Sequence, residues 1–416
     1  MAQVGLLDCN NFFVSCERLF RPDLWHKPVA VLSSNDGCIV ARSQEVKVLG
    51  IPMGAPYFQV RELCQKEGVT LFSGNLTFYR DISARVMQTL ADEVGPCEIY
   101  SVDEAFFSAS EGFSESDAAE LRSVVLKKVG VPVSVGIAST KTLAKVASEV
   151  GKKGDGYCLL STEKWQEYAL ETSTGSIWGL GRATTSKLTE LGVKSASDFM
   201  NLSRTSLRAS FGVGVERVYD ELHGKRVFGV GENSEVLRQS IASTRSFASE
   251  TKSLSDLESA VAGHVVHVAE KLRERGLCAS RLYVQLLTNR HGDFFMQGGS
   301  GEVILKSPTA QTAVLLKEAL KQARQLYRSG VPYKKAGVVA SGLLPENLVT
   351  QSLFEEEVVE SSSIDTTIDA INERFGRGTL RPGVLLDAGV KTSAKLRSPH
   401  YTTLWKDIPT VHAKTP

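Results

Sequence analysis

Short apolar runs and amphipathic stretches alternate along the first 165 residues. The apolar run at 3–8 ends in Asp8, and a second β-prone run at 99–107 contains Asp103 and Glu104. Residues 76–94 and 115–129 have the apolar spacing of helices, and 132–137 form another strand-like run before a helix at 141–150. Strands and helices that alternate around an acidic centre predict a ferredoxin-like α+β core.

The segment 21–73 interrupts this core with a pattern of its own. Apolar runs at 28–32 and 38–41 predict two strands, and residues 50–54 have the glycine and proline content of a turn. We therefore expect a small inserted α/β lobe.

Residues 166–228 consist of short helical stretches separated by glycines, which predicts a small helical domain. The polar residues 229–237 are interpreted as a linker. Residues 238–343 then predict a βαββαβ domain: a capping box at 255–258 precedes a helical stripe, and residues 282–286 alternate as a strand. A second helix is expected to open at Ser307-Pro308 and run to about Arg328, before a last strand from Lys334 to Leu344.

The segment 344–416 begins as an acidic, polar stretch, typical of a partly flexible tether. Its last forty residues regain aromatic and aliphatic side chains and are expected to fold or dock locally.

Composition fits several domains, since 416 residues with 42% hydrophobic content can bury more than one core. The net charge of +1 hides a basic module, because residues 238–342 carry 15 Lys and Arg against 8 Asp and Glu. Seven scattered cysteines without a close pair indicate neither a disulfide framework nor a zinc site. With no signal peptide or membrane-length apolar run, we expect a soluble cytosolic protein.

Asp8, Asp103 and Glu104 are the main chemical signal. Acids at strand ends are costly unless paired, and a pair of Mg²⁺ ions is the partner that best explains three of them. A single Asp-Glu dipeptide would more simply be a solvated strand end; the whole set favours a metal-dependent phosphoryl-transfer site.

Aromatic and basic residues near these acids suggest a nucleotide pocket. Asn11, Phe12 and Phe13 follow the first acid directly, and the aromatic rings could form the floor of a sugar pocket or simply pack in the core. The candidate triphosphate cations are Arg42, Lys47, Lys152 and Lys153, for each of which a solvated surface charge is the alternative.

Two motifs further along suggest macromolecular contacts. Gly179, Gly181 and Arg182 have the spacing of a helix-hairpin-helix, in which glycines let backbone N–H groups approach a DNA phosphate; a plain helical turn is the alternative. Gln351, Leu353 and Phe354 lie in the acidic tether, where a short apolar peptide could dock into a partner's groove or match by chance.

The motifs taken together resemble those of Y-family translesion DNA polymerases. Residues 8–17 (DCNNFFVSCE) are similar to the family's first motif, and residues 101–106 (SVDEAF) to its second. Two further segments resemble the UmuC branch of the family: residues 34–43 (SNDGCIVARS) and 398–405 (SPHYTTLW). The similarity covers nearly the whole chain.

The resemblance implies a domain plan and site roles. It implies a palm (1–20 and 74–165), fingers (21–73), a thumb with helix-hairpin-helix elements (166–228) and a little finger (238–343). Asp8, Asp103 and Glu104 would hold two Mg²⁺ ions with the Cys9 carbonyl. Phe13 would be the steric gate that excludes a ribose 2′-OH. Lys47 and Lys152 would bind the triphosphate, with Arg42 as a plausible addition.

The implied activity is error-prone translesion synthesis, in which dNTPs are added to a primer 3′ end opposite damaged template during DNA repair and SOS mutagenesis. The implied partners are primer-template DNA, the sliding clamp through 350–354, a UmuD′ dimer and RecA, in the bacterial cytoplasm at the nucleoid and not at a membrane. Two other hypotheses stay open: another palm-type enzyme, such as a nucleotide cyclase, and a non-catalytic DNA-binding subunit.

Three positions depart from the family pattern. The UmuC branch commonly has Tyr at the gate where this chain has Phe13, and Gln44 stands where many relatives outside the branch have Tyr. The glutamine of the clamp-like peptide is shifted by one place.

Overall fold

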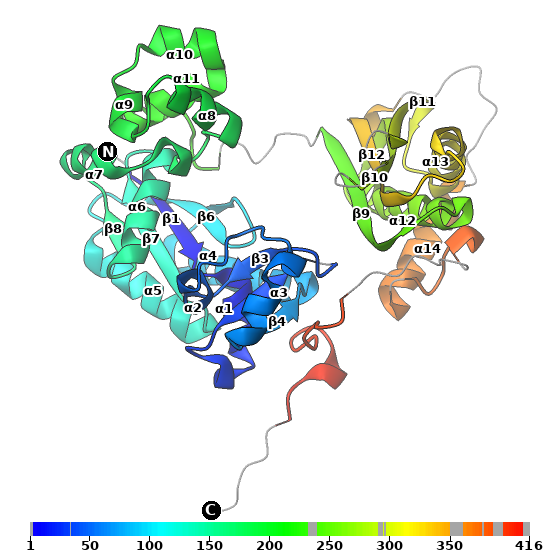
Figure 1. Cartoon of the computed structure of the whole chain (residues 1–416), viewed down its shortest axis with the longest axis horizontal. Helices are drawn as coiled ribbons and strands as arrows, with labels where there is room; N and C mark the ends of the chain where they lie inside the picture. The colour runs from blue at the N-terminus through cyan, green and yellow to red at the C-terminus, as the bar shows by residue number, and fades with distance from the viewer. Residues whose placement is uncertain are drawn as a thin grey trace, which may run out of the picture. The chain divides into compact units, whose positions relative to one another are not determined.

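The structure is a computed structural model, which describes residues 3–33, 35–231, 239–289, 294, 297–349, 361–376, 378–385 and 394–410. The chain forms two compact units (Figure 1). Unit 1 comprises Met1–Val236 together with Lys395–Pro416, and unit 2 comprises Leu237–Ala394. The C-terminal residues therefore return to the unit in which the chain begins.

The centre of unit 1 is a five-stranded sheet with the order β5-β6-β1-β7-β8. The strands are β1 (Gln3–Cys9), β5 (Cys97–Ile99), β6 (Glu104–Ala109), β7 (Val133–Ala138) and β8 (Tyr157–Leu159). Together with its helices, this sheet is the predicted α+β core.

Helices cover both faces of this sheet because its strands alternate two buried sets of side chains. On one face, Leu7 and Cys9 of β1 pack with α1 (Phe12–Leu19), α4 (Leu76–Val94) and α5 (Glu115–Val129). On the other, Val4 and Leu6 pack against α6 (Lys141–Lys153). The helices predicted at 76–94 and 115–129 have the observed bounds.

The inserted lobe is a three-stranded sheet with two short helices. Strand β2 (Val29–Leu32) lies between β3 (Ile39–Arg42), which is antiparallel to it, and β4 (Thr70–Ser73), which is parallel. The strand β4 was not predicted. The lobe also contains η1 (Pro22–Leu24), α2 (Gln44–Val48) and α3 (Tyr57–Lys66). Its small core includes Leu32, Ile39 and Ile51.

The helical domain of unit 1 lies over the α6 side of the sheet and shares a core with it. It consists of α7 (Thr162–Glu171), η2 (Thr174–Ser176), α8 (Arg182–Glu190), α9 (Ala196–Met200), α10 (Arg204–Phe211) and α11 (Val213–Leu222). The indole N–H of Trp165 on α7 donates to the carbonyl of Leu222 at 2.9 Å, which joins the first of these helices to the last.

Unit 2 contains the predicted βαββαβ domain, with an antiparallel sheet in the order β11-β10-β12-β9. Its elements are β9 (Ser240–Thr251), α12 (Leu254–Arg273), β10 (Leu277–Thr288), β11 (Gly299–Thr309), α13 (Thr312–Leu326) and β12 (Tyr333–Pro345). Both helices pack on one face of the sheet, where they bury the apolar residues of β10 and β12.

Two local predictions in unit 2 were wrong. The helix α12 begins two residues early, because Ser253 caps it by accepting a hydrogen bond from Asp256 N–H, and the box expected at 255–258 does not form. Ser307 and Pro308 lie in β11 and not in α13. A proline is tolerated there because β11 is an edge strand of the sheet.

The tail is more structured than a tether. It contains η4 (Glu346–Leu348), α14 (Ser361–Phe375), η5 (Gly383–Leu385) and η6 (Trp405–Asp407). Arg273 of α12 forms a bidentate ion pair with Asp369 of α14, with N···O distances of 2.6 and 2.8 Å. Asp365 accepts from the backbone N–H of Thr312 at the start of α13. These contacts hold α14 against α12 and α13 within unit 2.

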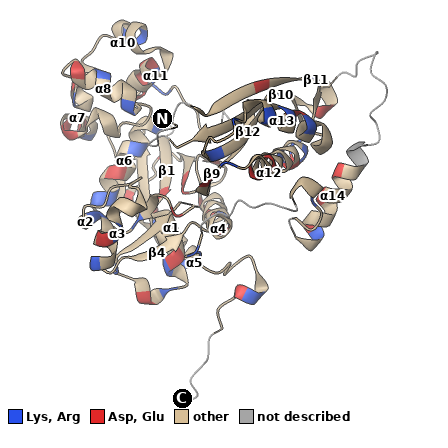
Figure 2. Ribbon diagram, turned by 45° about the vertical axis from the view of Figure 1, so that its right-hand side comes forward, with Lys and Arg blue, Asp and Glu red and all other residues tan. Residues whose placement is uncertain are grey.

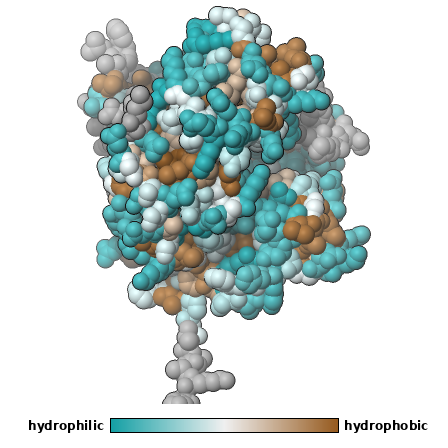
Figure 3. Space-filling model, turned by 90° about the vertical axis from the view of Figure 1, so that its left-hand side faces the viewer, coloured by the Kyte–Doolittle hydropathy of each residue, from teal (hydrophilic) through white to brown (hydrophobic). Residues whose placement is uncertain are grey.

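The surface carries charges of both signs on most helices, and Lys and Arg are also seen on α13 and around the sheet of unit 2 (Figure 2). Hydrophobic side chains on the face shown in Figure 3 lie in separate patches among hydrophilic ones. Among the described residues, no helix has the length and apolarity needed to cross a membrane.

Candidate active site

The register of two neighbouring strands brings the acidic motifs together. Strands β1 and β6 are antiparallel, with Asp8 directly opposite Glu104. The N–H of Cys9 donates to the carbonyl of Asp103 at 2.8 Å, so that Asp103 lies beside the same pair. Alternation along β1 and β6 directs Asp8 and Glu104 to the face that α6 covers, the face on which Leu6 and Phe106 are buried.

The helix α6 brings lysines to these carboxylates. Lys152 Nζ lies 2.9 Å from Asp8 Oδ2, and Lys145 Nζ lies 2.7 Å from Glu104 Oε2. The two lysines are seven residues apart and therefore lie on one face of the helix. The helix approaches the sheet closely because of Gly136 on β7, whose missing side chain would lie 2.3 Å from the carbonyl oxygen of Ala144 on α6.

Aromatic rings surround the ammonium group of Lys145. Its nitrogen lies 4.6 Å from the ring centre of Tyr100 and 5.7 Å from that of Trp178, and the indole N–H of Trp178 donates to the Tyr100 hydroxyl at 2.9 Å. Cation–π attraction and this hydrogen bond join the sheet to the helical domain beside Glu104.

Burial makes the negative charge of Asp8 unfavourable. Loss of solvent raises the pKa of Asp8 to about 7; Lys152 opposes this shift, whereas the neighbouring Glu104 adds to it. Asp103 instead accepts a short hydrogen bond from the hydroxyl of Ser101. Among the described residues, the site therefore contains three carboxylates but only two paired lysines, Lys145 and Lys152.

The donor chemistry fits hard divalent cations. Asp8, Asp103 and Glu104 supply oxygen ligands, and burial raises the pKa of the Cys9 thiol well above its usual value, which leaves only the carbonyl of that residue as a ligand. The side chains are not arranged as a closed metal site: no cluster of three or more His, Cys, Asp or Glu in the described ranges could hold an ion as it stands. A cation between Asp8 and Glu104 would relieve their repulsion, and the lysines are partly exposed and able to move aside.

Three of the predicted triphosphate cations are close together. Burial lowers the pKa of Lys47, and the charges of Arg42 and Lys152 lower it further, whereas Asp8 raises it. The guanidinium of Arg42 also donates to the carbonyl of Ile51. Lys153 is exposed on α6. The structure thus pairs Lys152 with Asp8 and brings Lys47 within electrostatic range of Arg42, Lys152 and Asp8, whereas Lys153 is exposed on α6.

The aromatic pair after the first acid divides into two environments. Phe12 is only 3% exposed and packs in the core, because the first turn of α1 points it inward. A nucleotide contact by Phe12 stays a prediction. Phe13 is half-buried and stacks on Tyr79 of α4, with ring centres 4.4 Å apart. Asn11 precedes α1 in a left-handed conformation with φ of 47° and makes no capping hydrogen bond through its side chain.

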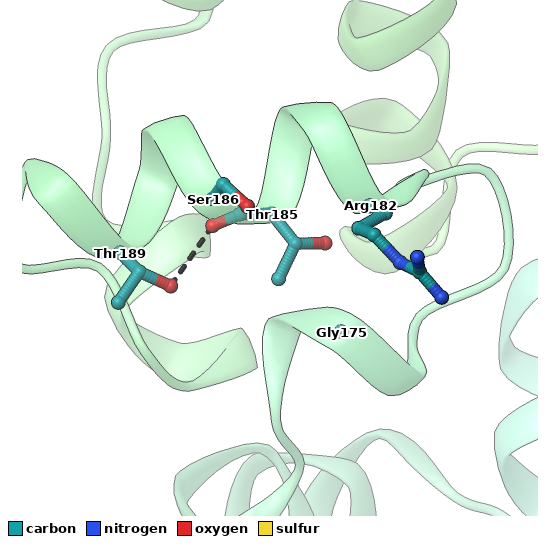
Figure 4. Close-up of a pocket in the computed structure, with 5 residues that line it drawn as sticks. All are labelled: Gly175, Arg182, Thr185, Ser186 and Thr189. Atoms are coloured by element: carbon teal, nitrogen blue, oxygen red, sulfur yellow. Dashed lines mark hydrogen bonds between the residues drawn. The ribbon is translucent and has the colours of Figure 1, made fainter. Parts of the chain in front are cut away.

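The predicted hairpin is a turn that leads into α8. Gly179 has φ of +93°, and a side chain there would lie 2.5 Å from Val218 of α11, so this glycine is required by the fold. Gly181 precedes α8 with open space around it, and Arg182 is exposed beside it. Beside this turn is an open hollow of about 460 Å³, lined by Gly175, Arg182, Thr185, Ser186 and Thr189 (Figure 4).

Sequence reasoning missed Lys145 and Tyr79. The spacing of Lys145 seven residues before Lys152 was a usable signal, because it places both on one helix face. Tyr79 carried no such signal, since the sequence gives it the same apolar setting as its neighbour Phe78, the other buried aromatic residue of α4. The clamp-like residues Gln351, Leu353 and Phe354 lie outside the described residues.

Comparison with known proteins decides the family. Residues 7–149 match the model of the impB/mucB/samB family, and residues 238–353 match the C-terminal domain of the same family. The chain is 35% identical to Protein UmuC of Salmonella typhimurium, over 97% of this chain and 99% of that protein. The chain belongs to the impB/mucB/samB family.

Other members and a solved structure agree with this assignment. The family member MucB of Escherichia coli is 31% identical over 97% of this chain and 98% of its own length, and DNA polymerase IV of Desulfatibacillum aliphaticivorans is 27% identical over 91% and 96%. A Y-family DNA polymerase chimera, Dbh-Dpo4(243-245)-Dbh, has the same fold, with a TM-score of 0.67 at 19% identity over 82% of this chain and 99% of that chain. The expected Y-family, UmuC-type DNA-directed DNA polymerase is thereby confirmed. Residues 362–411 match a domain of unknown function.

Proposed function

We propose that this family member extends a primer 3′ end with dNTPs opposite damaged template, with two Mg²⁺ ions held by Asp8, Asp103, Glu104 and the Cys9 carbonyl. The observation that carries the proposal is the direct pairing of Asp8 with Glu104 across β1 and β6, beside the carbonyl contact to Asp103. When bound, the ions would supply charge stabilisation for the attacking and leaving oxygens.

The residues of the chain would bind and orient the nucleotide. Lys152 lies next to Asp8, and Lys47 feels the charges of Arg42 and Lys152, so these three cations would bind the phosphates of a dNTP. Phe13 rests on Tyr79 with one side half-exposed, as a steric gate under the sugar requires. Asn11, in its left-handed turn, would let the backbone pass close to the nucleotide.

Two regions would hold the duplex. The N-terminus of α8, with Gly181 and Arg182, offers backbone N–H groups to a phosphate after the tight turn that Gly179 makes possible. In unit 2 the helices cover one face of the sheet, and the other face exposes Arg281 and Tyr283. The local excess of positive charge would attract the DNA backbone.

Partners and cellular setting follow from similarity to UmuC. We include in the proposal a role in SOS mutagenesis at the bacterial nucleoid, with the sliding clamp, a UmuD′ dimer and RecA as partners.

The test is primer extension by Asp103→Ala. Loss of one of the three carboxylates should reduce nucleotide incorporation by about 1,000-fold or more, because charge stabilisation supplies most of the catalysis in phosphoryl transfer. Binding of primer-template, measured by fluorescence anisotropy, should change little. Glu120→Ala on α5, an exposed carboxylate of the same unit, is the matched control and should extend primers normally.

Extension by Asp103→Ala at the normal rate would refute the polymerase site. A product that forms without primer-template would instead support a nucleotide cyclase, and metal-independent DNA binding without incorporation would support a non-catalytic subunit.

A further inference from the structure

The C-terminal segment 395–408, which we call the strap, is held on unit 1 by a series of specific contacts. The N–H of Leu396 donates to the Ser73 hydroxyl at 2.9 Å, and the N–H of Ser73 donates to the carbonyl of Leu396 at 3.0 Å. The Asn75 side-chain amide donates to the carbonyl of Ser398 at 3.0 Å. Ser398 itself is buried, at 6% exposure. A chain segment bonded in this way has a defined position on the unit.

The strap contacts both places at which the chain passes between the palm and the fingers. The chain leaves the palm after Phe20, and the ring of Tyr401 stacks on Phe20 with ring centres 4.5 Å apart. It returns from β4 into α4 at Ser73 and Asn75, which bond to Leu396 and Ser398. The strap therefore contacts both chain segments that connect the inserted lobe to the rest of unit 1.

A buried carboxylate continues this contact into the palm. Glu17 on α1 is fully buried, and its Oε1 atom accepts hydrogen bonds from the Ser398 hydroxyl at 3.0 Å and from the Tyr79 hydroxyl at 2.6 Å. The Tyr79 ring in turn stacks on Phe13. Four side chains thus form one continuous series: Ser398, Glu17, Tyr79 and Phe13.

These contacts determine the position of the Phe13 ring. The ring of Phe13 rests on a ring whose far end is tied to Glu17, and Glu17 is held in place by the strap. If the strap leaves, Glu17 loses one of its two hydrogen-bond donors and Tyr79 gains freedom to shift, so that Phe13 can move away from the sugar. A displacement below 1 Å is enough to weaken a steric exclusion.

We propose that the strap is a positioning element for sugar selectivity: Ser398, through Glu17 and Tyr79, holds Phe13 where it excludes a 2′-OH. This inference rests on the proposed function, in which Phe13 faces the sugar of the incoming nucleotide. Ser398, Glu17 and Tyr79 are positioning residues and touch no substrate.

The experiment measures kcat/KM for a dNTP and for the matching rNTP, and takes their ratio as the sugar selectivity. Ser398→Ala removes one hydrogen bond from Glu17 and should lower the ratio about fivefold, the factor that corresponds to one net hydrogen bond. A chain that ends after Ala394 lacks the whole strap, and its selectivity ratio should fall about tenfold or more. The fall should come more from a higher kcat/KM for the rNTP than from a lower kcat/KM for the dNTP.

Control variants test whether the sugar selectivity depends on particular contacts of the strap. A chain that ends after Thr410 keeps the strap and should have the selectivity of the full chain. Tyr401→Ala removes the stack on Phe20 and should lower the ratio, whereas Trp405→Ala changes an aromatic residue that is 90% exposed and should not. A synthetic peptide of residues 395–410, added to the chain that ends after Ala394, should restore the ratio.

Phe13→Ala separates the steric gate from the strap that positions it. It should abolish most of the selectivity, and Ser398→Ala should then have no further effect in the double variant, because the strap acts through Phe13. If Phe13→Ala lowers the ratio but neither Ser398→Ala nor the removal of the strap does, the positioning role is wrong and the gate stands. If Phe13→Ala leaves the ratio unchanged, the gate itself is wrong, and the strap inference falls with it.

Discussion

At the scale of single residues, the site is a problem of charge balance. Asp8 and Glu104 face each other across two strands, and each has a lysine of α6 within 3 Å. Because burial raises the pKa of Asp8 to about 7, the pocket favours the arrival of positive charge. Lys145 and Lys152 supply part of this positive charge by pairing with the two carboxylates.

Lys152→Ala tests the triphosphate role. The ammonium lies next to Asp8, where a phosphate could replace the carboxylate as its partner. Its loss should raise KM for the dNTP by about 10- to 100-fold, since a charged hydrogen bond contributes about 1.5–3 kcal/mol, with a smaller change in kcat. Steady-state extension of a primer measures both constants.

The matched control for that variant is Lys153→Ala, which removes an exposed lysine from the next position of the same helix. Equal effects of the two substitutions would show that general positive charge matters and not the position of Lys152.

Glu17 gives a prediction for the dependence of stability on pH. Burial raises its pKa to about 7, against the lowering effect of the Tyr79 and Ser398 hydrogen bonds, from an ordinary value of 4.5. Glu17 then binds a proton more tightly in the folded state than in the unfolded state. The contribution of this proton to the stability of the fold is present below about pH 4.5 and is lost as the pH rises to 7. Glu17→Gln cannot titrate and escapes this loss.

The variant should therefore gain stability relative to the natural chain between pH 4.5 and 7, by up to about 3 kcal/mol above pH 7. Thermal unfolding at pH 5 and pH 8 measures the change. Glu120→Gln, on the exposed surface of α5, should follow the natural chain at both values. A stability difference independent of pH would contradict the raised pKa.

At the scale of elements, close backbone approach decides where functional groups lie. Gly136 lets α6 lie against β7, and this brings two lysines onto the carboxylates. Gly179 similarly lets the turn before α8 pack against Val218 of α11, with a backbone conformation that favours glycine. In both cases a missing side chain sets the position of a helix.

Substitution by alanine should have different effects at the two glycines of the turn before α8. Gly179→Ala adds a methyl group at positive φ and close to Val218, and should destabilise the helical domain by about 2 kcal/mol or more. Gly181→Ala has open space and should fold normally, but should weaken primer-template binding by hindering a phosphate at the start of α8. Thermal unfolding and anisotropy give the two measurements. Normal DNA affinity of Gly181→Ala would argue for a plain turn.

At the scale of the whole molecule, charge is divided unevenly while the total stays near zero. Residues 238–342 carry an excess of seven positive charges in a chain of net charge +1. Attraction to DNA phosphates should therefore come mainly from unit 2, and it should depend strongly on salt.

Replacing Arg281 and Lys335 together by alanine tests this view. Both side chains lie on strands of unit 2, out of phase with the residues that pack beneath the helices. Each lost phosphate contact should reduce the slope of log K against log[salt] by about 0.9, so the double variant should lose about two. The control, Lys317→Ala with Lys321→Ala on the exposed side of α13, should keep the slope.

Apolar residues that recur with a period of 2 or 3.6 predicted most strands and helices. A strand or helix with one buried face shows this periodicity in any fold. The helix α4 was predicted with its observed bounds, α5 was predicted near its observed range, and the βαββαβ order of unit 2 was correct. Errors occurred where local signals compete. At Ser307-Pro308 an edge strand accommodates the proline, and residues 361–375, expected to be part of a tether, form the helix α14, whose Asp365 and Asp369 bond to α13 and α12.

The residues that could do chemistry were recognisable before folding is considered, since hard acids beside apolar runs and a basic module have few physical explanations. Which of these residues meet depends on the folded chain. The pairing of Asp8 with Glu104 is set by the register of two strands, the position of Lys145 by helix packing over Gly136, and the bond of Ser398 to Glu17 by a contact across 381 residues. Such contacts depend on the whole chain having folded, and no local pattern encodes them.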